Sequence, residues 1–185
     1  MDARREVELA MRGDHDAFAS LAAASADRLF ALARMILRDT DRAEDAAQEA
    51  LVKAWRELPR LRDPDKFDAW MRRLLVNACY DEARRTNRRA EVRSIPLHEP
   101  GGGDPGPSFV DRDRVDRGLR RIPVEQRAVL VLFHHQGLTH PEIAETLGIP
   151  LGTVKSRMRY AVAAMRAAIE SDDRGTDAVG EGRTA

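Results

Sequence analysis

The sequence predicts an all-α protein of two small helical domains joined by a flexible linker rich in glycine and proline. Apolar residues recur at helical spacing in two separate stretches, no stretch alternates as a strand would, and glycine and proline gather between the two. With 185 residues, 43% hydrophobic and 34% charged, the chain can bury a core and is not collagen-like or wholly disordered. We expect a first domain at 1–88, a linker at 89–112, a second domain at 113–170 and a disordered tail at 171–185.

Charge and cysteine content narrow the class of protein further. The 31 Lys and Arg residues balance 31 Asp and Glu residues, so the net charge of zero indicates no partner by itself. Cys79 is the only cysteine, which excludes an internal disulfide and a cysteine-rich zinc site. No apolar run has the length of a membrane span or the position of a signal peptide, so we expect no membrane insertion and a cytoplasmic location.

The first domain contains a helix with an acidic face. Polar turns at 13–14, 39–41 and 62–65 separate its helices, and we expect one helix from Asp41 to Leu58, with Asp41 and Glu44 resembling a capping box. Its apolar stripe is Ala47, Leu51, Ala54 and Leu58, and the opposite face holds Asp41, Asp45, Gln48, Glu49 and Val52. Such a face suits a basic helical partner, although most charged faces only keep a helix solvated.

The next helix is basic. Its expected inner side is Phe67, Trp70, Met71, Leu74 and Ala78, and it also carries Arg72, Arg73, Asn77, Tyr80, Arg84, Arg85, Arg88 and Arg89. Guanidinium groups neutralise phosphates, and stacking on an aromatic ring is worth about 1–3 kcal/mol per base. The pattern therefore favours binding to unpaired bases and their backbone.

The second domain has the parts of a helix-turn-helix. Thr139 followed by Glu142 predicts a capping box, Pro141 suits the first turn, and Gly148 can end the helix in a left-handed conformation. We expect the turn at 149–152.

The helix after this turn is the expected recognition helix. Its inward residues are Val154, Met158, Ala161, Val162 and Met165, and Thr153, Lys155, Ser156 and Arg159 face outward. Cations and small hydroxyl groups at the start of a helix can contact base edges and phosphates in a major groove. The second domain is therefore predicted to bind duplex DNA.

No pattern predicts catalysis, a metal site or a cofactor. His134, His135 and His140 lie close together in the sequence, but no carboxylate or cysteine completes a recognisable ligand set, so a structural or surface role is expected. The sequence contains no nucleophile elbow and no phosphate-binding glycine motif. We expect a protein that is not an enzyme and needs no cofactor.

Three segments carry a family resemblance. DTDRAEDAAQEALVKAWREL, FDAWMRRLLVNA with DEARR, and EIAETLGIPLGTVKSR occur in this order, and IPVEQRAVLVLF follows the Gly/Pro linker. The chain resembles an extracytoplasmic-function (ECF, group IV) sigma factor of the sigma-70 family over nearly its whole length except the two ends. The resemblance implies a sigma domain 2 helical bundle followed by a sigma domain 4 helix-turn-helix, without a middle domain.

The resemblance also implies partners. The first is the bacterial RNA polymerase core, through its β′ clamp helices and β flap, with Asp45, Gln48 and Glu49 matching the motif that docks on the clamp helices. The second is promoter DNA, and a third is an anti-sigma factor that holds the protein inactive. The function implied is an alternative sigma factor that directs promoter-specific initiation.

Two DNA sites follow from the resemblance. It places Asn77 near the pocket that captures a flipped −10 base, with the loop from Arg62 to Lys66 beside it. Together with residues of the basic helix described above, the expected −10 surface is Asn77, Arg73, Tyr80, Arg84, Arg85, Arg88 and Lys66. Thr153, Lys155, Ser156 and Arg157 match the family's recognition helix, which reads the −35 duplex. Arg159, on the outward face described above, completes the expected −35 surface.

Two other functions stay open from the residues alone. A stand-alone helix-turn-helix regulator would bind its operator tightly without polymerase. A helical adaptor without promoter selectivity is suggested by Phe133 and Tyr160, which depart from the family pattern. Charge reversal at Asp45 and Glu49 distinguishes these functions, because only a sigma factor needs the acidic face to act.

Overall fold

The computed structural model describes residues 3–93 and 118–180, and these ranges contain helices and turns but no strand. The α-helices are α1 (Ala3–Met11), α2 (His15–Leu37), α3 (Thr40–Glu57), α4 (Phe67–Arg93), α6 (Val124–His134), α7 (His140–Leu147) and α8 (Leu151–Gly180). Two short 3-10 helices, η1 (Leu58–Arg60) and η2 (Pro64–Lys66), connect α3 to α4. The all-α fold class is confirmed.

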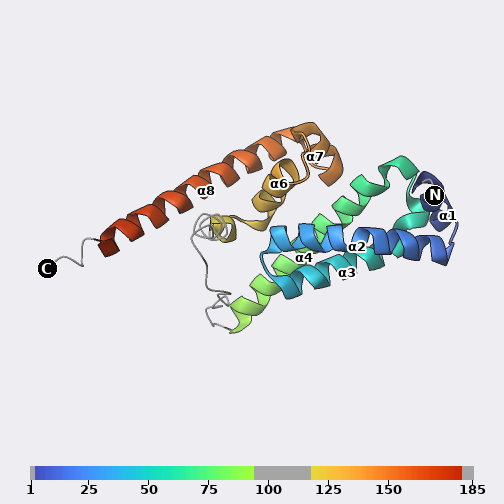
Figure 1. Cartoon of the computed structure of the whole chain (residues 1–185), viewed down its shortest axis with the longest axis horizontal. Coiled ribbons are helices and arrows are strands. Elements are labelled where there is room, and N and C mark those ends of the chain that lie inside the picture. Colours follow the sequence, from blue (N-terminus) through green and yellow to red (C-terminus); the bar gives the residue numbers. More distant parts are fainter. Residues whose placement is uncertain (1–2, 94–117, 181–185) are drawn as a thin grey trace.

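Helices α1 to α4 form the first domain, in which α2, α3 and α4 pack against one another (Figure 1). Asp14 and Asp39 cap α2 and α3, each accepting hydrogen bonds from backbone amides of the first turn. Helix α3 turns a stripe of small side chains inward, made of Ala43, Ala46, Ala47, Ala50 and Ala54. These alanines let α3 lie close to its neighbours.

Helices α6, α7 and α8 form the second domain. Ile122, Leu132, Ile143 and Val154 are almost fully buried and bring the three helices together. The predicted capping box is present, because Thr139 and Glu142 exchange hydrogen bonds at the start of α7. Gly148 ends α7 with a φ of 64°, the left-handed conformation that favours glycine. The helix-turn-helix is therefore built as the sequence predicts.

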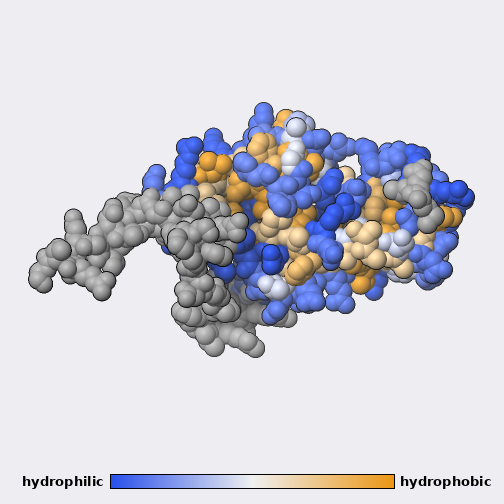
Figure 2. Space-filling model, viewed as in Figure 1, coloured by the Kyte–Doolittle hydropathy of each residue, from blue (hydrophilic) through white to orange (hydrophobic). Residues whose placement is uncertain are grey.

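The second domain rests on the first. Helix α6 contacts α2 and α4, α7 contacts α4, and one cluster of buried apolar residues extends through both domains. Figure 1 shows α6 and α7 lying over α2 and α4, with α8 leading away from them. The visible face is largely hydrophilic, with apolar residues gathered in separate patches, one of them where α8 passes α6 (Figure 2). The two predicted domains therefore share a core.

Several element boundaries differ from the prediction. Helix α3 begins at Thr40 with Asp39 as its cap, because Asp39 and not Asp41 adopts the extended conformation that a cap requires. The turn after α7 is shorter than predicted: Leu151 and Gly152 are already helical, since the Pro150 carbonyl accepts the amides of Thr153 and Val154.

Two helices also run further than predicted. Helix α4 extends to Arg93, past the expected linker start at 89, and α8 extends to Gly180, past the expected tail start at 171. No proline interrupts either extension, and a single internal glycine costs a helix only about 1 kcal/mol. The rest of the predicted linker, 94–112, and the chain after 180 lie outside the described residues.

Candidate nucleic-acid interface

The acidic face of α3 points to solvent. Asp45 and Gln48 are exposed, and Glu49 is half-buried. Lys53 lies 3.5 Å from the Glu49 carboxylate and 3.5 Å from the Asp81 carboxylate of α4. The face thus combines two exposed polar side chains with one carboxylate beside a cation, on a helix that buries its alanines in the bundle.

Helix α4 presents a basic surface. Arg73, Asn77, Arg84, Arg85 and Arg88 are all exposed. Two of these arginines form ion pairs with acidic residues one turn earlier in the helix. Arg84 lies 3.1 Å from Asp81, and Arg85 lies 3.5 Å from Glu82. The exposed pair between Arg84 and Asp81 is weak, so the Arg84 guanidinium can exchange to a phosphate at little cost. Glu82 is buried, so transfer of Arg85 to a phosphate would leave a buried carboxylate without that partner.

Tyr80 differs from the exposed arginines of α4, because it is half-buried. Burial raises the pKa of its hydroxyl to about 12, and the nearby charge of Arg157 on α8 opposes part of that rise. The buried hydroxyl makes no hydrogen bond of ordinary geometry with the described residues. Tyr80 thus lies against the second domain and not on open surface.

The short 3-10 helix η2, which precedes α4, forms ion pairs with α1 and with α7. Asp63 caps η2 by accepting the amide of Asp65, and the Asp65 carboxylate forms an ion pair with Arg4 of α1. Lys66 Nζ lies 2.6 Å from Oε1 of Glu145 on α7, and this hydrogen bond raises the pKa of Lys66. The predicted −10 residue Lys66 is therefore paired with a residue of the second domain.

The N-terminal turns of α8 carry the predicted duplex-reading residues. Lys155 and Arg159 are exposed, while Thr153, Ser156 and Arg157 are half-buried. The hydroxyl of Ser156 donates to the carbonyl of Thr153 at 3.0 Å, which turns it along the helix. This surface offers cations around a small polar centre, as a major-groove reader requires.

Sequence reasoning gave Tyr160 no role at this surface. Its side chain is 54% exposed, and the guanidinium of Arg159 lies 5.1 Å from its ring centre. Tyr160 follows Ser156 by four residues, so it continues the Thr153 and Ser156 face one turn further. That helical spacing was the signal in the sequence that marks it.

Arg127 and Glu145 were also missed, and both join the two domains. Arg127 is buried and donates to the carbonyls of Ile36 at 2.8 Å and Ile122 at 2.8 Å. Glu145 holds Lys66, as described above. Their partners in the first domain, Ile36 and Lys66, are 91 and 79 residues away in the chain, so no local pattern indicates them.

The histidines have structural contacts. His140 stacks on Phe133 with ring centres 5.1 Å apart, and His134 meets the edge of the same ring at 4.9 Å. Within 3–93 and 118–180, no group of three or more His, Cys, Asp or Glu side chains is placed to hold a metal ion. None of the helices described has the length and apolar character needed to cross a membrane.

A helix-turn-helix beside a second basic helical surface defines a DNA-binding protein. Comparisons with known families identify its class. Residues 21–89 match Sigma-70 region 2, and residues 112–165 match Sigma-70, region 4. The ECF RNA polymerase sigma factor SigM of Mycobacterium tuberculosis is 36% identical over 146 residues, which span 78% of this chain and 73% of SigM.

More distant relatives cover more of the chain. The ECF RNA polymerase sigma factor SigW of Bacillus subtilis is 27% identical over 88% of this chain and 94% of its own. Among solved structures, CnrH in complex with the cytosolic domain of CnrY has a TM-score of 0.66 at 26% identity, covering 92% of this chain and 98% of that one. The Bartonella quintana sigma factor RpoE with the anti-sigma factor NepR has a TM-score of 0.67 at 24% identity, covering 84% and 98%.

The chain belongs to the sigma-70 family of RNA polymerase sigma factors, in its ECF group. It is an alternative sigma factor that directs promoter-specific transcription, and the stand-alone regulator is not favoured. The two sigma domains expected from the sequence are confirmed as a helical bundle and a helix-turn-helix.

Proposed function

We propose that each exposed surface of this sigma factor performs one step of initiation. The acidic face of α3, with Asp45, Gln48 and Glu49, docks on the β′ clamp helices of core polymerase. The basic surface of α4 then receives the melted −10 strand, and the start of α8 reads the −35 duplex. The observation that carries this proposal is the separation of one acidic and two basic surfaces onto three different helices.

The −10 surface combines charge with one amide. Asn77 lies among the arginines of α4 and can hydrogen-bond the edge of an unstacked base, while Arg73, Arg84, Arg85 and Arg88 neutralise the strand. The Tyr80 ring, which the second domain covers in this structure, can stack on a base once it is uncovered, and Lys66 supplies a charge at the entry to α4. Unstacking one base costs a few kcal/mol, which such contacts can offset.

The −35 surface acts on intact duplex. Lys155 and Arg159 are proposed to contact phosphates or guanine edges, and Thr153, Ser156 and Arg157 to complete the contact with the major groove. Polymerase holds both DNA-binding surfaces near one promoter, so that weak contacts act at a high effective concentration. The protein itself then needs no catalytic group, and it acts where polymerase acts, in the cytoplasm.

Run-off transcription with purified core polymerase on genomic fragments tests the docking step. Wild type is expected to give transcripts that core polymerase alone does not, and Asp45→Arg/Glu49→Arg is expected to lose them. Asp27→Arg/Glu57→Arg is a matched control, because it makes the same change of charge at exposed acids outside the proposed face. Transcripts that persist in the first variant would contradict docking through α3.

An anti-sigma factor is proposed as a further partner. One solved structure that this chain resembles contains the anti-sigma factor NepR, and another contains the cytosolic domain of CnrY. On the second domain, an apolar groove between α6 and α8 is open to solvent and lined by Leu130, Val131, Val162 and Met165. The apolar face of an amphipathic helix suits such a groove.

A reporter for a promoter of this sigma factor, in the native host, tests the anti-sigma proposal. Val162→Glu places a charge in the groove and is expected to raise reporter activity by releasing the inhibitor. Unchanged activity at an equal level of folded protein would contradict a partner at this groove.

A further inference from the structure

We infer that a pocket at the junction of the two domains binds a short chain of phosphate groups, such as inorganic polyphosphate or the phosphate chain of a nucleotide. The pocket lies where the last turn of α2, the first turn of α3 and the later part of α4 meet the start of α6. Its volume is about 290 Å³, close to the lower limit of about 300 Å³ for small-ligand pockets. None of the described residues that line it belongs to the proposed polymerase or DNA surfaces.

Arginine is the main polar residue of this pocket. Four arginines line it, and the described lining residues include no aspartate or glutamate. The four come from both domains: Arg42 from α3, and Arg120, Arg121 and Arg127 from the start of the second domain. The guanidinium group is planar and always charged, and its forked donors fit phosphate oxygens. A ligand with several phosphates can therefore contact arginines of both domains at once.

The positive charges at this junction are crowded. Arg38 directly follows the lining residue Leu37, and burial lowers its pKa by disfavouring the charged form. The charges of Arg120 and Arg34 lower that pKa further. Like charges held together oppose the compact state, and a bound polyanion would relieve their repulsion. The crowding therefore favours a ligand that carries several negative charges.

The start of α6 adds to the positive potential. Pro123 is the N-cap of α6 and makes no side-chain capping hydrogen bond, and Pro123 and Val124 both line the pocket. Backbone amides in the first turn of a helix have no carbonyl partner within that helix, and the helix dipole favours an anion beside them. The helix end and the arginines are independent features of the chain, and both indicate an anion.

The lining favours a phosphate chain over an apolar group or a base. Ile36 and Ile122 line the pocket but are almost fully buried, so a ligand reaches little of their apolar surface. Arg121 and Asn87 are exposed, and Arg42 is half-buried. The groups that a ligand can reach thus include guanidinium groups and an amide, which donate hydrogen bonds to phosphate oxygens.

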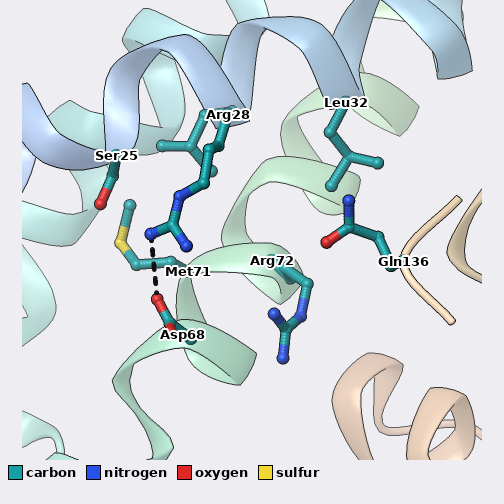
Figure 3. Close-up of a pocket in the computed structure, with 8 residues that line it drawn as sticks. Ser25, Arg28, Leu32, Asp68, Met71, Arg72 and Gln136 are labelled. Atoms are coloured by element: carbon teal, nitrogen blue, oxygen red, sulfur yellow. Dashed lines mark hydrogen bonds and ion pairs between the residues drawn. The ribbon is translucent and has the colours of Figure 1, made fainter. Parts of the chain in front are cut away.

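A second pocket between the domains lacks this excess of positive charge. Its volume is about 40 Å³, and Gln136 lines it from the second domain (Figure 3). Arg28 and Asp68 face one another there, with 3.3 Å between guanidinium and carboxylate. Contact between the domains therefore does not by itself gather arginines without an acid in the lining.

Isothermal titration calorimetry of the full chain with sodium tripolyphosphate tests the site. Arg42→Gln/Arg121→Gln is expected to weaken binding at least about tenfold, because two of the four guanidinium groups are lost. Arg12→Gln/Arg60→Gln removes the same charge at exposed positions outside the pocket and is expected to bind as the wild type does. Equal binding by the wild type and the pocket variant would overturn the inference. If circular dichroism shows that the pocket variant is unfolded, Arg121→Gln alone, at an exposed position, gives the same test.

Thermal unfolding separates a specific site from an effect of salt. At about 100 times its dissociation constant, tripolyphosphate is expected to raise the Tm of the wild type by about 5–10 °C. Sodium sulfate at the same ionic strength is expected to raise it less, and an equal rise would overturn the site. ATP without magnesium presents the same phosphate chain. Tighter binding of ATP than of tripolyphosphate would identify a nucleotide as the ligand, and equal or weaker binding would identify the inorganic chain, so that either result supports the site.

Discussion

The Arg127 side chain, in the second domain, donates a hydrogen bond of 2.8 Å to the carbonyl of Ile36, the penultimate residue of α2 in the first domain. A carbonyl in the last turn of a helix has no partner within its own helix. One terminal nitrogen of Arg127, Nη1, therefore supplies a donor for a carbonyl at the end of α2. The other, Nη2, donates to the carbonyl of Ile122 within the second domain. One buried side chain joins the two folding units.

Loss of this side chain should destabilise the protein. Arg127→Gln is expected to lower the free energy of unfolding by about 1–3 kcal/mol, because buried carbonyls lose their donor. Urea denaturation followed by circular dichroism measures the change. Arg56→Gln, at an exposed position on α3, is the control and should stay within about 0.5 kcal/mol of the wild type. Equal stability of the two variants would show that the Arg127 contacts contribute nothing.

The capping box of α7 gives a second prediction. Thr139→Ala is expected to lower the free energy of unfolding by about 1 kcal/mol at neutral pH, because the cap loses its hydroxyl. Hydrogen bonds from Thr139 lower the pKa of Glu142 in the folded protein from its ordinary value of 4.5. The contribution of the Glu142 carboxylate is thus present above about pH 4.5 and is lost as the pH falls through the folded value.

Thermal unfolding of wild type and Thr139→Ala across the acidic range checks this linkage. The stability difference between them should shrink as Glu142 becomes protonated. A difference that stays constant down to the lowest pH at which both proteins fold would exclude the charged capping box.

Cys79 should be chemically silent in the folded protein. It is fully buried in the core, and burial raises the pKa of its thiol from 9.0 to about 12. A thiol reagent at pH 8 is expected to react only at the rate at which the protein opens, and at once in denaturant. Fast reaction of the native protein would show that the core around Cys79 opens readily.

The same burial makes the protein sensitive to alkali. Because the folded pKa of Cys79 is raised, its contribution to stability is complete below about pH 9.0 and is lost as the pH rises towards 12. Tyr80 adds a similar loss between 10.0 and about 12. Cys79→Ala should give a smaller fall in the free energy of unfolding between pH 9 and 10 than the wild type, and an unchanged slope would contradict this.

Tyr160 should contribute to duplex binding. It is exposed beside Arg159 and continues the face of α8 that holds Ser156. Tyr160→Ala is expected to weaken binding of −35 duplex by about 1 kcal/mol, roughly fivefold, through loss of the ring that orients Arg159. Tyr160→Phe, which keeps the ring, should bind nearly as the wild type does. Fluorescence anisotropy with the polymerase holoenzyme measures both, and equal affinity of all three would remove Tyr160 from this interface.

Sequence patterns predicted those features whose causes are local. The Thr139 and Glu142 capping box and the Gly148 helix end depend on residues within one turn, and the structure confirms them. Periodicity also predicted the inner sides of α4 and α8, where Phe67 and Val154 are buried. The predicted capping box at Asp41 and Glu44 was wrong, because Asp39, two residues earlier, caps α3.

The docking of the two domains lay beyond such patterns. Glu145 reads as an ordinary exposed acid of α7, and its link to Lys66 depends on how 79 residues of chain fold between them. The sequence likewise places Tyr80 on the basic surface of α4 without showing that another domain covers it. Predicting long-range contacts of this kind requires the three-dimensional structure. The residues that make up each surface can be predicted from the sequence.

The inward alanines of α3 affect which mutations a protein of this fold can tolerate. The side chains that pack α3 against the bundle are methyl groups, which have no rotamers to rearrange. The position of α3 in the bundle therefore depends little on the residues of its outer face. Mutations can therefore accumulate on the outer side and alter partner preference without disturbing the bundle. A larger residue at Ala50, which is fully buried, would instead wedge the helix outward and shift every outer side chain together.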